Sequence, residues 1–232
     1  MRKICLDYGH GGTDPGAMYK GRRESDDNLR MGTAFAKELR RHGIAVDETR
    51  TSDVTVDLRE RSAFSNKGTY DYFISVHRNA FKPEMASGAE TFISVNGSEK
   101  AKNLARGIQR ALVDLGFYDR GVKTAKFHVL RETKAPAMLV EIGFIDNTND
   151  NFIFDGKSEE IARGIAKAII EELGVEYMEE ESALKQAVDI LAEKGIIGTP
   201  EYWVEHAKAG KTVNGEYAAT LIERMAAFFM KK

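Results

Sequence analysis

The chain has 232 residues, which is enough for one medium-sized domain and a small second module. Its residues are 42% hydrophobic and 30% charged, with a formal net charge of −2, so the sequence is typical of a folded globular protein. No basic excess points to nucleic acid, and no membrane span is predicted because the longest apolar runs reach about half of the roughly 20 residues that a spanning helix needs.

Strand and helix patterns alternate along the first three quarters of the chain. The predicted strands are KICLDYG, IAVDETR, DYFISVH, GAETFISV, FHVLR and AMLVEIG. The predicted helices are 25–42, 57–67, 97–116 and 157–174. Ser25 and Asp26 are expected to cap the first helix. This alternation predicts an α/β fold, with a twisted, mostly parallel or mixed sheet flanked by helices.

The composition changes at VEYMEEES, an acidic stretch that is typical of a linker. We therefore predict a main domain over 1–175, a linker over 176–182 and a small all-helical module over 183–232. Within the module, helices are expected over 182–194, from Thr199-Pro200 onward and over about 215–230.

Four residues suited to metal chemistry stand near the ends of apolar runs or before the first helix: His10, Glu24, His77 and Glu141. Ligands of α/β sheets bind beyond the carboxyl ends of the strands, where His10, His77 and Glu141 are expected to lie. A buried, unpaired carboxylate such as Glu141 would be costly unless it served a metal, a partner or catalysis. Each residue alone is compatible with a structural role, but together they match a zinc hydrolase, which needs three ligands and a further carboxylate.

Four segments give this pattern a family context: LDYGHGGTDPGA, GRRESDDN, DYFISVHRNA and HVLRETKAPAMLVEIGFIDN. In their order and spacing, the chain resembles the zinc-dependent N-acetylmuramoyl-L-alanine amidases of the Amidase_3 type over about residues 2–174. The resemblance implies that His10, Glu24 and His77 bind Zn²⁺ and that Glu141 is the catalytic residue that transfers protons. It also implies hydrolysis of the amide bond between N-acetylmuramic acid and L-alanine in bacterial peptidoglycan.

Two positions depart from the family pattern. Arg78 replaces a small residue and Asp146 replaces a serine. Arg78 is expected at the rim of the cleft, where it either binds a carboxylate of the stem peptide or pairs with an acid at the surface. Asn79 matches the family and is expected to bind substrate or to brace the loop that carries a ligand.

The remaining histidines are less informative. His128 either contacts substrate, supports the cleft or has a purely structural role. His42 and His206 are expected to be solvated.

Other functions stay open at this point. The same ligands would serve a zinc peptidase or carboxypeptidase acting on another amide of the stem peptide, and a non-catalytic wall-binding module would keep the fold alone. The module over 183–232 is expected to bind the cell wall, to form a homodimer or to pack against the main domain. Because no signal-peptide pattern is seen, we expect a protein made in the cytoplasm that reaches the wall after release, as an endolysin does; release by bacterial lysis or action in a sporulating mother cell is the alternative.

Overall fold

The structure is a computed structural model that describes residues 2–208 and 210–230, without the side chains of residues 180–183. The chain forms two compact units, Met1–Tyr177 and Met178–Lys232, each of which is described by itself.

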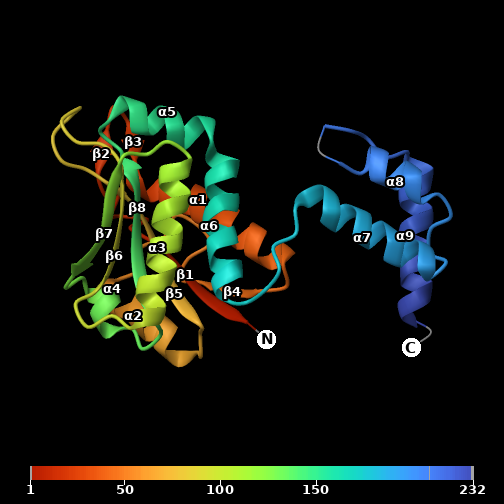
Figure 1. Cartoon of the computed structure of the whole chain (residues 1–232), viewed down its shortest axis with the longest axis horizontal. Coiled ribbons are helices and arrows are strands. Elements are labelled where there is room, and N and C mark those ends of the chain that lie inside the picture. Colours follow the sequence, from red (N-terminus) through yellow and green to blue (C-terminus); the bar gives the residue numbers. More distant parts are fainter. Residues whose placement is uncertain (1, 209, 231–232) are drawn as a thin grey trace. The chain divides into compact units, whose positions relative to one another are not determined.

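A mixed sheet runs through the first unit (Figure 1). Among the described residues it has six strands in the order β4-β1-β5-β8-β6-β7. Their bounds are β1 Lys3–Tyr8, β4 Ala45–Glu48, β5 Tyr72–Asn79, β6 Ala89–Ser94, β7 Asp119–Ala125 and β8 Ala137–Phe144. The strands β4, β1, β5 and β8 are parallel, whereas β6 is antiparallel to β8 and parallel to β7. The predicted α/β class with a mostly parallel sheet is therefore confirmed.

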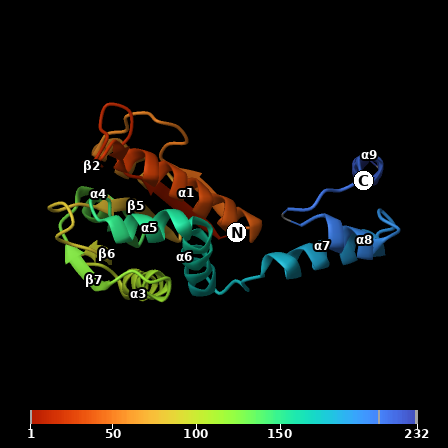
Figure 2. The same cartoon turned by 90° about the horizontal axis from the view of Figure 1, so that it is seen from above.

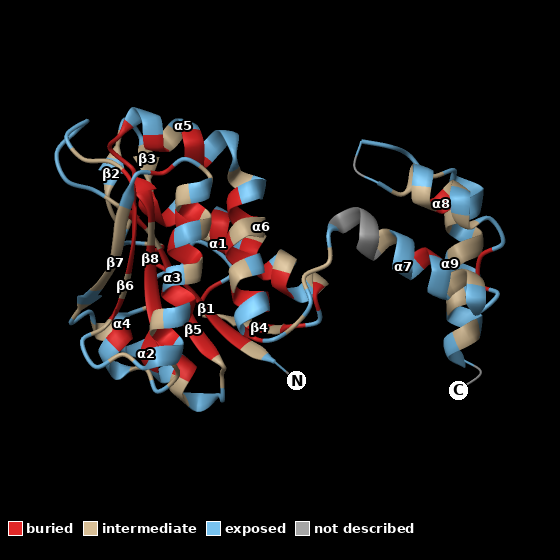
Figure 3. Ribbon diagram, viewed as in Figure 1, coloured by how far each residue is buried: buried red, intermediate tan, exposed pale blue. Residues whose placement is uncertain are grey.

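Helices cover both faces of this sheet. On one face lie α1 (Glu24–Arg41), α3 (Glu99–Asp114) and α6 (Ser158–Glu172), with α6 between the other two (Figure 2). The other face carries α2 (Leu58–Lys67) and the short α4 (His128–Glu132). The central strands β1, β5 and β8 are almost completely buried (Figure 3), which explains their continuous apolar runs.

The segment FHVLR forms the helical turn α4, so the strand predicted there is wrong. Val129 and Leu130 are adjacent in sequence, yet both are buried in the same apolar cluster. A strand would direct two successive side chains to opposite faces, whereas a helical turn brings both to one side. The edge strand β7 lies just before this turn and was not predicted, because its sequence DRGVKTA is charged and contains glycine.

Other local predictions need smaller corrections. Helix α1 begins at Glu24 after the N-cap residue Arg23, so Ser25 and Asp26 lie in its first turn and do not cap it. The helix α5 (Thr148–Gly156) and the hairpin of β2 (Met18–Tyr19) and β3 (Arg22–Arg23) were not predicted.

Two histidines expected in solvent are covered. The side chain of His42 has no exposed surface, and its ring stacks on Tyr177 with centroids 4.6 Å apart. His206 is half-buried and stacks on Tyr202 at 4.2 Å. Each histidine lies at or near the end of a helix, where a neighbouring tyrosine shields its ring.

The second unit is helical, as predicted. Its helices are α7 (Glu180–Glu193), α8 (Pro200–His206) and α9 (Gly215–Met230), and they enclose a small core of Val188, Ile196, Ile197 and Trp203. Trp203 is thus an anchor of this core.

Within the described residues, no helix is both long and apolar enough to cross a bilayer.

Candidate active site

His10 lies in a tight loop directly after β1. Its backbone has φ = 61°, a left-handed conformation that is rare for residues other than glycine. The buried guanidinium of Arg61 donates to the His10 carbonyl oxygen and to Asp7, which ties the loop to the strand before it. Asp14 bonds the ring Nδ1 at 2.8 Å, so Nε2 is left to face the cleft. Strain in a loop held this firmly is typical of a functional position.

Glu24 is the first residue of α1 and is only 4% exposed. The backbone N–H groups of Ala17 and Arg78 donate to its carboxylate at 2.9 and 3.1 Å. The amide of Asn28, one turn further along the helix, adds a contact at 3.4 Å. These donors hold both carboxylate oxygens in place, and the start of a helix favours negative charge.

His77 and Glu141 are direct neighbours across two parallel strands. They are paired in register near the carboxyl ends of β5 and β8, so both side chains leave the same face of the sheet. The ring of His77 fits against Gly9, where a Cβ atom would lie 2.2 Å from Cε1 of His77. The edge predicted from the apolar runs therefore carries both residues.

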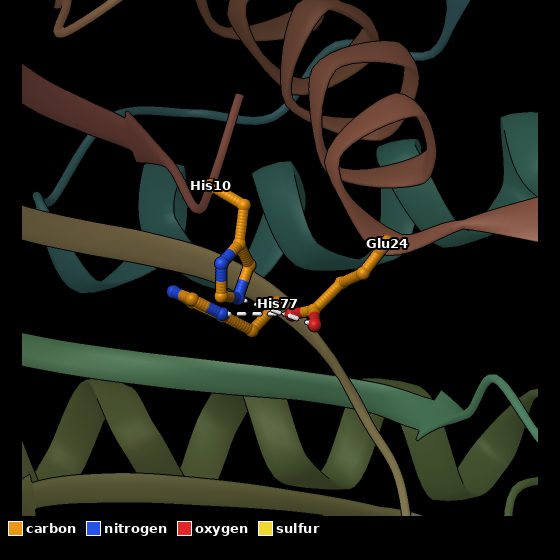
Figure 4. A group of neighbouring side chains, drawn as sticks. All are labelled: His10, Glu24 and His77. Carbon is orange, nitrogen blue, oxygen red and sulfur yellow. Dashed lines mark hydrogen bonds and ion pairs between the residues drawn. The ribbon is translucent and has the colours of Figure 1, made fainter. Parts of the chain in front are cut away.

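The side chains of His10, Glu24 and His77 converge from a loop, a helix and a strand (Figure 4). Each offers one ligand atom, and these atoms lie within 4.8 Å of one another. Nε2 of His10 is 3.2 Å from one oxygen of Glu24, and Nδ1 of His77 is 2.9 Å from the other. Two imidazole nitrogens and one carboxylate oxygen form a donor set that suits zinc.

The charges in this cluster attract positive charge. Burial alone would lower the pKa of His10, but the hydrogen bonds and charges of Glu24 and Asp14 raise it to about 9. The pKa of His77 is raised in the same way by Glu24, against burial. Burial acts to raise the pKa of Glu24, yet the two histidines hold it well below its usual range. The negative charge of this carboxylate would be balanced by protons on the two histidines or by a bound divalent cation.

Glu141 lies beside the cluster but is not part of it. Its Oε2 atom is buried without a hydrogen-bond partner among the described residues. Burial is the main reason that the pKa of Glu141 is raised to about 7; His77 opposes the increase and Glu24 adds to it. A buried carboxylate oxygen without a partner, next to a cluster of metal ligands, is expected where a bound reactant supplies the missing hydrogen bond.

A cavity of about 420 Å³ opens onto these residues. His10, His77 and Glu141 line it together with Leu58 of α2, His128 of α4 and Phe127, the residue before α4. Nε2 of His128 lies 3.2 Å from the Ser62 hydroxyl. His128 thus lines the cleft and is also bonded within its wall.

The structure places Asn79 away from this cavity. Its amide donates to Glu90, and its side-chain oxygen accepts from the N–H of Ala80. It lines a second hollow with Arg120 and Phe144. A role of Asn79 in binding substrate stays a prediction.

Arg78 is not at the rim, contrary to expectation. Its side chain is fully buried, pairs with Asp27 at 2.7 Å and lies over the ring of Phe154 at 3.9 Å. Burial lowers the pKa of Arg78 to about 10. The alternation of side chains along β5 explains the error. Arg78 and His77 are adjacent and point to opposite faces of the sheet, so Arg78 faces α1 and α5 and cannot reach the cleft.

Several supporting residues could not be predicted. Asp14, Asn28 and Arg61 orient the cluster, but in the sequence they are ordinary polar residues of a turn and of the two predicted helices 25–42 and 57–67. Asp14 alone had a signal, the GHGGTDPG turn in which it lies four residues after His10.

Comparison with known proteins gives a consistent result. A family model described as N-acetylmuramoyl-L-alanine amidase matches residues 4–171. The amidase CwlM of Bacillus licheniformis is 40% identical over 73% of this chain and 68% of its own length. The endolysin of Bacillus phage SPP1 is 35% identical over 79% of this chain and 70% of its own. The crystal structure of an N-acetylmuramoyl-L-alanine amidase from Clostridium difficile 630 superposes with a TM-score of 0.71 and 32% identity, covering 75% of this chain and 97% of that one.

Proposed function

The chain belongs to the N-acetylmuramoyl-L-alanine amidase family, and from this premise we propose that His10, Glu24 and His77 hold a zinc ion while Glu141 transfers protons. The enzyme hydrolyses the amide bond between N-acetylmuramic acid and L-alanine in peptidoglycan. The observation that carries the zinc proposal is the convergence of two imidazole nitrogens and a carboxylate oxygen within 4.8 Å, beside a buried carboxylate without a partner.

The residues present fit a zinc ion. Nitrogen and oxygen donors in this number leave room for a reactant, as in catalytic rather than structural sites. Asp14 holds His10 through its other ring nitrogen, an arrangement common among metal-binding histidines. Gly16 leaves space beside the cluster, because a Cβ atom there would lie 2.7 Å from Oε2 of Glu24.

A bound zinc ion would supply Lewis acidity, lowering the pKa of water and stabilising negative charge on the substrate carbonyl oxygen. The protein supplies the rest. Glu141 accepts the proton of the attacking water on its free oxygen and then donates it to the nitrogen of the departing L-alanine, which leaves as a neutral amine. The apolar side chains of Leu58, Phe127 and Val129 in the cavity wall reduce the access of other water to this carboxylate.

Three measurements on purified protein test the proposal: zinc content, lytic activity and mass analysis of the products. Wild-type protein is expected to hold about one zinc per chain, and His77→Ala should lose both the metal and lytic activity. His206→Ala, a histidine in the second unit, serves as the matched control and should retain both. Mass analysis of digested peptidoglycan should find released stem peptides that begin with L-alanine. A fully active, zinc-free protein would refute the metal site.

We also propose that the protein acts as an endolysin. Support comes from its similarity to the SPP1 endolysin, whereas bacterial amidases of comparable identity make an autolysin the alternative. Cytoplasmic expression should lyse host cells only when a membrane-permeabilising protein is co-expressed. Glu141→Gln under the same conditions provides the control, and lysis without permeabilisation would favour an exported autolysin.

For the second unit we propose cell-wall binding, with self-association as the alternative. Its fold as a separate compact unit outside the family match supports a role distinct from catalysis.

A further inference from the structure

The catalytic edge of the sheet extends beyond the metal cluster. The strands β6 and β7 run against β5 and β8, so their first residues lie where the other two strands end. Glu90 near the start of β6 is the register partner of Glu141. The two side chains therefore leave the same face of the sheet, on adjacent strands.

Glu90 is the centre of a cationic cluster. It is 4% exposed and accepts from Lys123 and from Nε of Arg120, the latter at 3.2 Å. The side chains of Arg120 and Lys123 are 30% and 41% exposed. Glu90 thus carries one negative charge against two cations, of which Arg120 also interacts with the buried Asp150, and both cations keep N–H donors exposed to solvent on this side of Glu141.

The hollow beside this cluster has a volume of about 550 Å³. Its lining includes Arg120, the buried Glu90 to which Arg120 donates, and the exposed apolar side chains of Phe81, Met85 and Tyr118. A segment of peptide that carries both aliphatic groups and a carboxylate would suit such a lining.

The opposite side of the metal cluster differs in charge. The cavity between the cluster and α2 is lined by the exposed carboxylates of Asp14 and Asp57 and by the apolar Leu58 and Phe127, while the guanidinium of Arg61 in its lining is buried and paired with Asp7. An acidic peptide would be repelled there and attracted toward Arg120 and Lys123.

Distances across the sheet agree with a stem peptide that runs from the metal cluster toward β7. Neighbouring strands lie about 4.8 Å apart, so β7 is roughly 10 Å from β8. An extended peptide advances about 3.5 Å per residue. A carboxylate on the second stem residue would thus lie over β6, within reach of the long side chains from β7 that already contact Glu90.

We propose that Arg120 and Lys123 bind the free carboxylate of the second stem residue and so make the enzyme selective for D-glutamate over its amide, D-isoglutamine. This inference rests on the proposed function, because it assumes that the substrate's amide bond lies between the metal cluster and Glu141.

The test compares two soluble muropeptides that differ only in that carboxylate, with L-lysine as the third residue of both. Wild-type enzyme should have a kcat/KM about tenfold higher for the D-glutamate form, mainly through KM. The double variant Arg120→Gln/Lys123→Gln should bring this ratio close to one. Because that variant leaves Glu90 buried without a cation beside it, with only the Asn79 amide as a donor, a third change, Glu90→Gln, restores charge balance and should give the same ratio.

Lys102→Gln is the matched control. Lys102 is 39% exposed and paired with Glu99, much as Lys123 is paired, but it lies on α3. This variant should keep the wild-type ratio. Equal use of both muropeptides by wild-type enzyme, or an unchanged ratio in both multiple variants, would overturn the inference and leave the amidase function intact.

Binding measured without cleavage tests the carboxylate site independently of the reaction that the enzyme performs. Calorimetry of both muropeptides with the Glu141→Gln variant should give the same preference in Kd, whatever reaction the enzyme performs. Equal Kd values would contradict the carboxylate site even if the wild-type enzyme releases L-alanine peptides.

Discussion

The side chains at the centre of the site depend on polar contacts that hold them in place. His10 is oriented by Asp14, and Glu24 is held by two backbone N–H groups. Below them, Asp7 is buried against Arg61 and also accepts from the hydroxyls of Ser75 and Thr49. These contacts fix the donor atoms before any ligand arrives, which reduces the cost of ordering them on binding.

Replacing Glu141 with glutamine removes proton transfer while keeping shape and volume. We expect turnover to fall by about 10²- to 10⁴-fold. Zinc content should stay at the wild-type level, because Glu141 is outside the donor cluster. Metal analysis and muropeptide turnover on the same sample check this, and near-normal turnover would remove Glu141 from the mechanism.

Replacing Asp14 with asparagine should weaken metal binding without abolishing it. The carboxylate that orients His10 is lost, and contacts of this kind change metal affinity by about 10- to 100-fold. Competition with a chelator of known affinity measures the change. Asp26→Asn, on an exposed acid paired with Arg23, is the control and should leave the affinity unchanged.

The buried pair of Asp7 and Arg61 should make stability depend on pH. Burial acts to raise the pKa of Asp7, but Arg61 and the hydroxyl donors lower it below its ordinary value. The contribution of Asp7 is then complete above the unfolded-state pKa of about 3.9 and is lost as pH falls through the lower folded-state value. Asp7→Asn should cost about 3 kcal/mol at pH 7, because it leaves Arg61 buried without a charge partner.

Urea denaturation of both proteins at several pH values measures this dependence. The difference in unfolding free energy should be constant between pH 7 and 5 and should shrink below about pH 4. An equal difference at pH 7 and pH 3 would contradict the assignment.

At the scale of elements, the buried strands and long amphipathic helices could be predicted, because their apolar periodicity directly reflects burial. His77 and Glu141 followed from this, since each interrupts an apolar strand. Glu24 could not be found from periodicity, as it precedes a helix among other charges, and only the family resemblance assigned it the role of a metal ligand. Arg78 was misplaced because an arginine is normally exposed, and its buried partner Asp27 is distant in sequence.

The loop between β1 and α1 imposes a tight fit on the site. Gly9→Ala would place a methyl group within 2.7 Å of Nδ1 of His77, the atom that bonds Glu24, so the ring or the loop must shift and disturb this contact. We expect weaker zinc binding and lower activity. Gly156→Ala at the end of α5 meets no atom within 4 Å and should change neither. Zinc affinity of both variants measures the effect, and an unaffected Gly9→Ala would mean that the ring has room to adjust.

At the scale of the whole molecule, the first unit contains its own core and the complete cluster of candidate ligands. A chain ending at residue 177 should therefore fold and hydrolyse soluble muropeptides at the wild-type rate. On intact cell walls it should bind and act less well if residues 178–232 bind the wall. Sedimentation with purified walls measures binding, and full retention of wall activity would point to self-association as the role of that unit.

The reversed direction of β6 has a further consequence for how such enzymes diverge. The segment 80–88 joins the end of β5 to the start of β6, and both lie at the same edge of the sheet. Because this connection crosses no layer, its length and sequence can change without moving a helix or shifting a strand. Exchanging this loop between relatives is therefore expected to transfer substrate preference without changing the metal cluster. Exchanging the loop between β1 and α1 would instead replace His10, one of the proposed ligands.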